Sequence, residues 1–401
     1  MTNSMALRLS RTAIALLVAL GACWSTVVAR SEGATALTTV WSKQPAGSPF
    51  AAVDHQGNVL TAETATPGGI VVTKYDSNGN QLWTRSLSDT DAVLAVAADS
   101  TGNVLVASAS MLTSLSPSQP PDGSTVTNFT KTPSAPILSM TVDPSGNVLL
   151  AENTWDSDLT LEKFSASGVS DVQFPKMFSS TGGIEDLSLA VDSAGNIIVA
   201  AAYQFGTIDF GGGPRTAPYL DSMVLAKLTP SGGHIFSKIF NPTIAADGTY
   251  AGIYKVRAGC DSKNNIFTTG IIDGLGKLVM GSKSITLPPP GEETMFLAKF
   301  SPNGGTSFAK TVGADGVFVE AIAIDTAGNI LTTGENWSST FLGGVNGVFV
   351  AKFSSGGAYR AARIIGSTSG TANSIAVDRA SNDPVAAGSD SPANYLLKLN
   401  P

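Results

Sequence analysis

The sequence predicts an all-β protein, a seven-bladed β-propeller whose blades each contain four strands. Three observations carry this prediction: a turn motif that recurs seven times, a further strand that follows most copies of it, and chain ends that complement each other. Repeats of this size are typical of solenoids, propellers and arrays, so they are the first feature to interpret.

The turn motif consists of an apolar strand, the pattern Asp-x-x-Gly-Asn or a close variant, and a second apolar strand. An Asp at a strand end accepts hydrogen bonds from the turn backbone, and Gly and Asn tolerate the left-handed conformation of a tight hairpin. One carboxylate per turn falls short of the roughly 6–8 oxygens that calcium takes, which favours a hairpin over a calcium site. The leading residues are Asp54, Asp99, Asp143, Asp192, Asp261, Asp325 and Asp378.

A third strand with the pattern apolar-x-Ala-Lys-Phe follows, most clearly at 224–228, 296–300 and 349–353. The second copy departs from it, with Leu112 to Leu115 before a Pro-rich run. We interpret the recurring lysines as aliphatic stems along a sheet edge with their amines in solvent. They are Lys74, Lys163, Lys227, Lys299, Lys352 and Lys398.

A fourth strand follows the second turn, as at 81–85, 234–240 and 306–312, and completes a blade. The chain ends just after a third strand, at 398–401, whereas residues 37–43 have the pattern of a fourth strand. We therefore expect the N-terminal strand to complete the last blade. That pairing closes the ring and leaves no open edge between the first and last blades.

This pattern resembles the bacterial seven-bladed β-propeller repeats known as SBBP repeats. The resemblance rests on 325–330, 349–353 and 205–213, and it extends over nearly the whole chain after the leader. It implies an exported propeller and supplies no catalytic residues. The second and seventh copies depart most from the repeat, so the boundaries of those two blades are left open.

Residues 1–29 are similar to a secretory signal peptide, with Arg8 and Arg11 before an apolar stretch from Thr12 to Ala22. That stretch is too short to hold a chain in a bilayer as a stable anchor. We predict a leader at 1–29 and the propeller at 30–401, which implies a periplasmic, extracellular or outer-membrane-anchored protein.

Two ways of processing the leader stay open. Residues 27–29 fit ordinary cleavage before Arg30, whereas residues 20–23 resemble a lipobox in which Cys23 is lipidated. In either case no intrachain disulfide forms, because Cys23 is removed or lipidated and Cys260 is then left without a free cysteine to pair with. A lipid on Cys23 is the single membrane attachment that we expect.

The charge pattern excludes some partners. Charged residues make up 14% of the chain, and loss of Arg8 and Arg11 takes the net charge from −7 to about −9. An acidic chain without basic clusters is a poor binder of nucleic acids. We expect a monomer that needs no cofactor.

Long loops follow the second strands of the fourth, fifth and sixth copies, near 203–222, 271–294 and 335–346. Long loops on a rigid scaffold commonly carry binding sites. Aromatic residues that could stack on sugars or dock a protein gather on this face. They are Trp155, Trp337, Tyr203 and Phe205. The alternative is that these rings simply cap the blade tops.

Two charged residues interrupt the inner strands. Arg257 lies four residues before Asp261, and Glu320 lies five residues before Asp325, at positions where other copies have small or apolar residues. We expect an Arg257–Glu320 ion pair between adjacent blades near the central channel, with a structural role.

An enzymatic alternative is a metal-dependent lactonase or lyase at the channel mouth. Its carboxylates would come from Asp91, Glu185, Asp186 and Glu320, near the starts of inner strands. The two histidines, His55 and His234, are predicted in an outer turn and an outer strand, away from the channel, so a catalytic triad lacks its base. The favoured interpretation is an exported, non-enzymatic module that binds or organises an unidentified protein or glycan.

Overall fold

The computed structural model describes residues 37–65, 68–117, 126–153, 158–218, 221–243, 251–287, 292–313, 315–390 and 393–400. The predicted leader at 1–29, with Cys23, lies outside these ranges, as does Trp155. Within them, no helix is both long and apolar enough to cross a bilayer.

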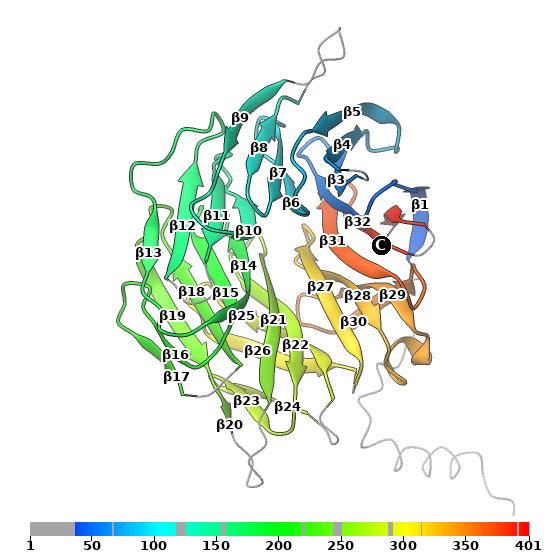
Figure 1. The fold of residues 1–401 in the computed structure, drawn as a ribbon. Coiled ribbons are helices and arrows are strands. Elements are labelled where there is room, and N and C mark those ends of the chain that lie inside the picture. Colours follow the sequence, from blue (N-terminus) through cyan, green and yellow to red (C-terminus); the bar gives the residue numbers. More distant parts are fainter. Residues whose placement is uncertain are drawn as a thin grey trace, which may run out of the picture.

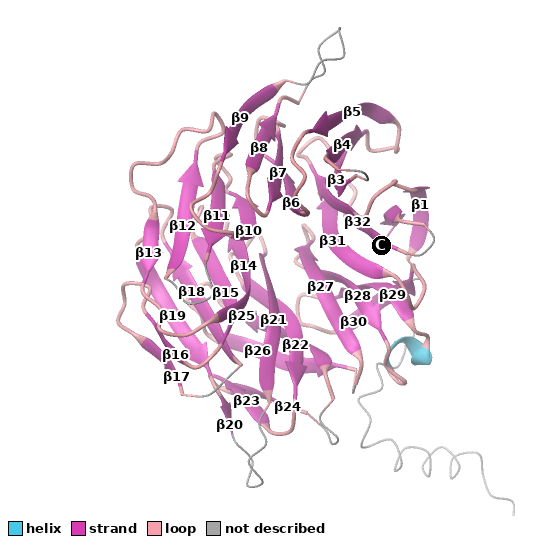
Figure 2. Cartoon of the chain, in the orientation of Figure 1, coloured by secondary structure: helices cyan, strands magenta, loops and turns pink. Residues whose placement is uncertain are grey.

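The described residues form seven four-stranded antiparallel sheets that stand around a common centre (Figures 1 and 2). We number the sheets 1 to 7 in chain order and call the first strand of each its inner strand. Neighbouring inner strands contact one another around the centre, and the inner strand of sheet 1 contacts that of sheet 7. The all-β prediction is confirmed, and the sheets are arranged as the blades of a propeller are.

Sheet 1 contains β2 (Pro49–Val53), β3 (Val59–Thr64), β4 (Ile70–Tyr75) and β5 (Gln81–Leu87). Sheet 2 contains β6 (Val93–Ala98), β7 (Val104–Ser108), β8 (Leu112–Leu115) and β9 (Thr127–Lys131). Sheet 3 contains β10 (Ile137–Val142), β11 (Val148–Glu152), β12 (Leu159–Phe164) and β13 (Lys176–Phe178). Sheet 4 contains β14 (Ile184–Val191), β15 (Ile197–Tyr203), β18 (Ser222–Leu228) and β19 (His234–Phe240). Sheet 5 contains β21 (Gly252–Cys260), β22 (Ile266–Asp273), β25 (Thr294–Phe300) and β26 (Thr306–Val312).

Sheet 6 contains β27 (Val317–Ile324), β28 (Ile330–Asn336), β29 (Gly347–Phe353) and β30 (Tyr359–Ile364). Sheet 7 contains β31 (Thr371–Asp378), β32 (Asp383–Ser389), β33 (Tyr395–Asn400) and β1 (Thr38–Lys43). The long loops add β16 (Gly206–Ile208) with β17 (Arg215–Ala217), a small sheet of β20 (Pro242–Thr243), β23 (Lys277–Met280) and β24 (Lys283–Thr286), and the 3₁₀ helix η1 (Phe341–Gly344).

The outer strand of sheet 7 comes from the start of the chain. Strand β1 pairs antiparallel with β33, from Thr38 opposite Asn400 to Lys43 opposite Leu396. The Trp41 indole Nε1 donates a hydrogen bond to the carbonyl oxygen of Ser77 in sheet 1, at 3.0 Å. The first described strand therefore joins the last strand of the chain and also contacts the next sheet.

The predicted hairpins are present, and Asp54 shows why they form. Its Oδ1 accepts hydrogen bonds from the backbone amides of Gln56 and Asn58, both at 2.9 Å, and its Oδ2 accepts one from the Asn58 side chain at 2.8 Å. Gly57 has a φ of 81°, in the left-handed region that favours glycine. One Asp thus satisfies the donors that the tight turn would otherwise leave unpaired.

The prediction of solvent-exposed lysines is wrong. Each recurring lysine forms an ion pair with the turn Asp of its own sheet, with Nζ–Oδ2 distances of 2.9, 3.0, 2.8, 4.0, 3.0 and 2.7 Å in chain order. Most of these lysines are buried. The turn carboxylate lies among apolar strands away from water, so the amine of the third strand supplies its countercharge. We call each of these contacts an Asp–Lys pair.

The Asp–Lys pairs also connect neighbouring sheets. Lys163 Nζ donates to the carbonyl oxygen of Pro230 at 3.1 Å, and Lys227 Nζ donates to that of Pro302 at 3.2 Å. Lys398 donates in the same way to Ser77 at 3.2 Å. Each acceptor lies in the turn between the third and fourth strands of the next sheet, so one amine joins a carboxylate in its own sheet to the backbone of its neighbour.

These contacts set the protonation of the turn carboxyls. Burial by itself raises a carboxyl pKa, because it disfavours the charged form. Here the hydrogen bonds from asparagine and lysine and the lysine charge outweigh burial, so the pKa values lie below their ordinary range. This holds for Asp54, Asp143 and Asp192. At Asp378 the pKa is lowered in the same way by the hydrogen bond and charge of Lys398, with further hydrogen bonds from the Ala380 amide and Ser381.

Glu162 of β12 titrates in the opposite direction. Burial and the neighbouring Glu152 raise the pKa of Glu162 from 4.5 to about 7, and Lys131 opposes this only in part. The free energy that protonated Glu162 contributes to folding is therefore fully present below about pH 4.5, and it is lost as the pH rises through about 7. We expect Glu162→Gln to remove this loss, so that its melting temperature exceeds that of the wild type at pH 8 but not at pH 5.

Differential scanning calorimetry across pH 5–8 measures this effect. The exposed Glu292→Gln is the matched control and should leave the pH dependence unchanged. A parallel pH profile for Glu162→Gln and the wild type would contradict the prediction.

Candidate functional site

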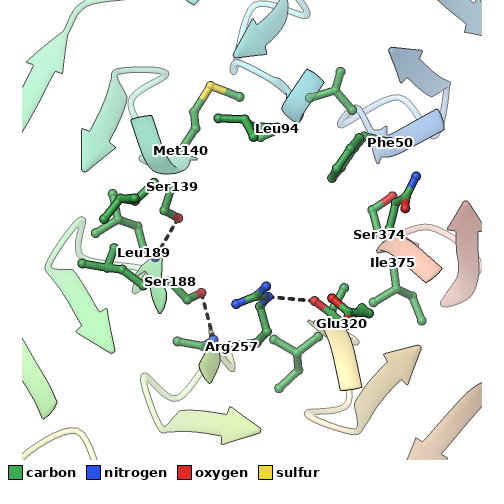
Figure 3. A pocket seen from close by; sticks show the side chains of 18 of the residues that line it. Phe50, Leu94, Ser139, Met140, Ser188, Leu189, Arg257, Glu320, Ser374 and Ile375 are labelled. Carbon is green, nitrogen blue, oxygen red and sulfur yellow. Dashed lines mark hydrogen bonds between the residues drawn. The ribbon is translucent and has the colours of Figure 1, made fainter. Parts of the chain in front are cut away.

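The inner strands surround a cavity of about 470 Å³ at the end of the molecule where these strands begin (Figure 3). All seven inner strands contribute to its wall. Phe50, Leu94 and Met140, from sheets 1 to 3, form an apolar side. Arg257 and Glu320, from sheets 5 and 6, form a polar side.

β-Bulges shape the mouth of this cavity. Six inner strands skip one residue in their pairing with the next strand, close to where they begin. A bulge re-aims side chains and ends regular pairing, and bulges are common beside functional sites. The bulged residues are Leu94, Leu138, Glu185, Tyr254, Glu320 and Asn373.

The expected Arg257–Glu320 ion pair is corrected by the structure. Arg257 Nη1 contacts Asp186 Oδ2 of sheet 4 at 2.5 Å, while its Nε donates to the backbone carbonyl of Glu320 at 2.7 Å. The Glu320 carboxylate instead accepts from Lys255 Nζ, at 2.5 and 2.7 Å. Arg257 reaches both neighbouring sheets, and Lys255 lies closer to the carboxylate that Arg257 was expected to hold.

We expect the double change Arg257→Ala/Asp186→Ala to destabilise the protein less than the sum of the single changes. Both side chains are partly buried, so the coupling should be about 1–2 kcal/mol, between the values of surface and buried pairs. Urea unfolding of the four proteins measures it as a double-mutant cycle. A larger coupling between Arg257 and Glu320 than between Arg257 and Asp186 would contradict the pairing seen here.

A series of serines, which sequence reasoning passed over, joins the inner strands. Ser139 Oγ accepts from the amide of Leu189 at 3.0 Å, and Ser188 Oγ accepts from that of Ala258 at 3.0 Å. Ser374 Oγ does the same for Ala51 across sheets 7 and 1, at 2.7 Å. Each serine lies four residues before its turn Asp, as Arg257 does. A serine four residues before the turn Asp is therefore the sequence feature that predicts this hydrogen bond to the next inner strand.

The structure separates the predicted aromatic residues. Tyr203 is fully buried, and its hydroxyl contacts Ser180, the amide of Gly182 and the carbonyl of Thr207, so the prediction that it forms a binding surface is wrong. Phe205 and Trp337 are 59% and 50% exposed. Both follow second strands at the end where inner strands begin, which is the end that holds the cavity mouth.

The four carboxylates of the enzymatic alternative are all engaged elsewhere. Glu185 accepts from the Gln204 side chain at 2.5 Å, and Asp91 accepts from the Ser110 hydroxyl. Asp186 and Glu320 face the cations described above. Within the described ranges, no three His, Cys, Asp or Glu side chains are grouped closely enough to hold a metal ion.

A second cavity, of about 530 Å³, lies at the opposite end, where the inner strands reach their turns. His55, Arg379 and Cys260 line it. The placement of His55 in an outer turn is therefore wrong, because the turn after an inner strand lines this cavity. His55 does not line the mouth cavity at the other end. His234 lies in an outer strand, as expected. Burial raises the pKa of Cys260 to about 12, which keeps its thiol protonated at neutral pH.

Comparisons with known proteins are consistent with this architecture. The chain is similar to Raptor of Chaetomium thermophilum, with a TM-score of 0.58 and 10% identity, over 92% of this chain and 29% of Raptor. It is similar to a streptogramin B lyase (TM-score 0.55, 12% identity, 92% of this chain and 100% of the lyase). It is also similar to BamB of Moraxella catarrhalis (TM-score 0.50, 12% identity, 91% of this chain and 99% of BamB).

These similarities support a β-propeller, and at such low identity they show the fold alone. No family model matches the chain. No curated protein matches it either. The resemblance to SBBP repeats therefore stays a prediction.

Proposed function

We propose that this protein is an exported, non-enzymatic β-propeller that binds a protein or glycan partner on the face around the cavity mouth. The exposure of Phe205 and Trp337, at the same end of the sheets as that mouth, carries the proposal, because exposed rings on a rigid scaffold stack on sugars and anchor protein partners. The carboxylates that a metal-dependent lactonase or lyase needs are engaged with cations, an amide or a hydroxyl.

The scaffold of this proposal is a closed propeller of seven SBBP-type blades, with β1 completing the seventh. Two contacts support closure: the pairing of β1 with β33, and the Ser374 hydrogen bond to Ala51 between sheets 7 and 1. Closure favours a binding role, because a ring holds its surface loops in fixed positions without presenting a long open sheet edge.

Export is part of the same proposal and rests on the leader pattern at 1–29. Ordinary cleavage before Arg30 gives a free periplasmic or extracellular protein, whereas lipidation of Cys23 gives one anchored at a membrane. Mass spectrometry of the mature N-terminus distinguishes the two, because a diacylated Cys23 adds the mass of its lipid.

A glycan array probed with residues 30–401 tests the binding role. We expect saturable binding to at least one glycan class, and we expect Phe205→Ala/Trp337→Ala to weaken it at least tenfold. Leu82→Ala is the matched control, because Leu82 is an exposed apolar residue on the outer strand β5. Equal binding by the double variant and the control would overturn the assignment of this face.

Thermal unfolding with calcium, zinc or a chelator tests the enzymatic alternative, since a ligand that binds only the folded state raises its melting temperature. A metal-dependent rise that is lost in Asp186→Asn or Glu320→Gln would favour a metal-dependent lactonase or lyase over the binding role.

A further inference from the structure

The wall of the mouth cavity carries a group of large apolar side chains on one side and the charged pair of residues Arg257 and Glu320 on another. Sheets 1 to 3 supply Phe50, Leu94, Leu138 and Met140, and Figure 3 shows those it labels on one side of the opening. Leu94 and Leu138 are 38% and 36% exposed, although they belong to inner strands. Large apolar side chains left open to a cavity of this size form the apolar part of a small-molecule site.

On the charged side, Arg257 has one donor nitrogen without a hydrogen-bond partner among the described residues. Arg257 uses Nε for the carbonyl of Glu320 and Nη1 for Asp186 and the carbonyl of Val256. Among the described residues, its Nη2 makes no hydrogen bond, and the guanidinium reaches into the opening (Figure 3). The two bonded nitrogens hold the guanidinium in place, so Nη2 presents a preorganised donor to an oxygen atom.

The charges around this donor are already balanced. Asp186 neutralises Arg257, and Lys255 neutralises Glu320. A ligand carboxylate would lie close to two protein carboxylates, and a ligand ammonium would lie close to Arg257. Either ion would lose water without gaining an unpaired partner, so the cavity favours an uncharged ligand with an oxygen acceptor.

We propose that the mouth cavity binds a small, uncharged, amphipathic molecule, with its apolar body against Leu94, Leu138, Phe50 and Met140 and a carbonyl or ether oxygen on Arg257 Nη2. The volume of about 470 Å³ lies within the range typical of such pockets. This site is separate from the exposed aromatic residues Phe205 and Trp337. If glycan or protein binding by Phe205 and Trp337 fails, this proposal still stands. If the cavity binds no small molecule, the proposed binding by those two rings still stands.

Fluorescence titration of residues 30–401 with Nile red, an uncharged fused-ring probe that carries a carbonyl, tests the proposal. We expect saturable, blue-shifted emission with one site per chain. Leu94→Gln/Leu138→Gln should weaken binding at least tenfold, because it places polar groups against the apolar body of the probe. Leu82→Gln, on an outer strand, should leave the affinity unchanged.

Two further variants separate the site from general surface binding. Leu138→Trp should fill the cavity and abolish saturable binding while its melting temperature shows that it is folded. Arg257→Lys keeps the charge beside Asp186 but removes Nη2, and it should weaken binding several-fold. Nile red binding that is unsaturable, unaffected by Leu138→Trp, or weaker than that of the anionic probe anilinonaphthalene sulfonate would overturn the proposal.

Discussion

Replacing Lys227 with methionine should lower the free energy of unfolding by about 3–5 kcal/mol, the range found when one partner of a buried ion pair is removed. Lys227 Nζ lies 2.8 Å from Asp192 Oδ2, with side chains 5% and 0% exposed. The same amine donates to the carbonyl of Pro302 in sheet 5. Methionine fills most of the same volume but leaves a buried carboxylate without its countercharge and a carbonyl without its donor.

Urea unfolding of residues 30–401 measures this loss, and two variants serve as controls. Lys263→Met changes an exposed lysine in the turn after β21 and should stay within about 0.5 kcal/mol of the wild type. Lys227→Met/Asp192→Asn should recover part of the loss, because the amide needs no countercharge. A loss below about 1 kcal/mol for Lys227→Met would show that the pair behaves as a surface ion pair.

Removing β1 should have the second large effect. A chain that begins at Gln44 lacks the outer strand of sheet 7 and the buried side chain of Leu37. It also lacks Trp41, which packs near Tyr75 and bonds to Ser77. We expect a loss of at least about 4 kcal/mol, from the burial of Leu37, the partial burial of Trp41 and the strand pairing. The exposed edge of β33 should promote self-association.

Thermal unfolding and light scattering after size-exclusion chromatography measure both consequences. The matched control begins at Leu37 and keeps every described residue, so it should melt and elute as the 30–401 chain does. A synthetic peptide of residues 37–43 added to the shortened chain should restore part of the melting temperature. Equal melting temperatures and a monomeric shortened chain would contradict a structural role for β1.

The sequence was sufficient for the local elements of the fold. The turn Asp, the following Gly and the closing Asn act within five residues of one another, so their hydrogen bonds follow from residue type and spacing alone. The complementarity of residues 37–43 to the end of the chain also predicted the pairing of β1 with β33. The turns after Asp261 and Asp378 lack the Gly of the motif. They still form, because Asn264 and Asn382 adopt the left-handed conformation there.

The site could be predicted only in part. The sequence indicated that Arg257 and Glu320 face the centre, because charges stand at two repeat positions where other copies have small or apolar residues. It did not indicate their partners, because both ion pairs join different sheets. Asp186 comes from sheet 4 to Arg257, and Lys255, which follows the bulge in β21, reaches Glu320 of sheet 6. Tyr203 also belongs to a long-loop region by sequence, yet it is buried, and its hydroxyl bonds to Gly182 before β14 and to Thr207 in β16.

The sequence by itself determined the strands, their hairpins and the four-strand unit, because these depend on contacts between residues close together in the chain. Only the tertiary structure decided how the recurring lysines are used, which carboxylate holds Arg257, and which end of the channel His55 lines. These depend on distances between sheets that are remote in sequence. Lys227 is an example: its amine contacts the buried carboxylate of Asp192 in its own sheet and the carbonyl of Pro302 in the next. A single repeat does not contain both partners.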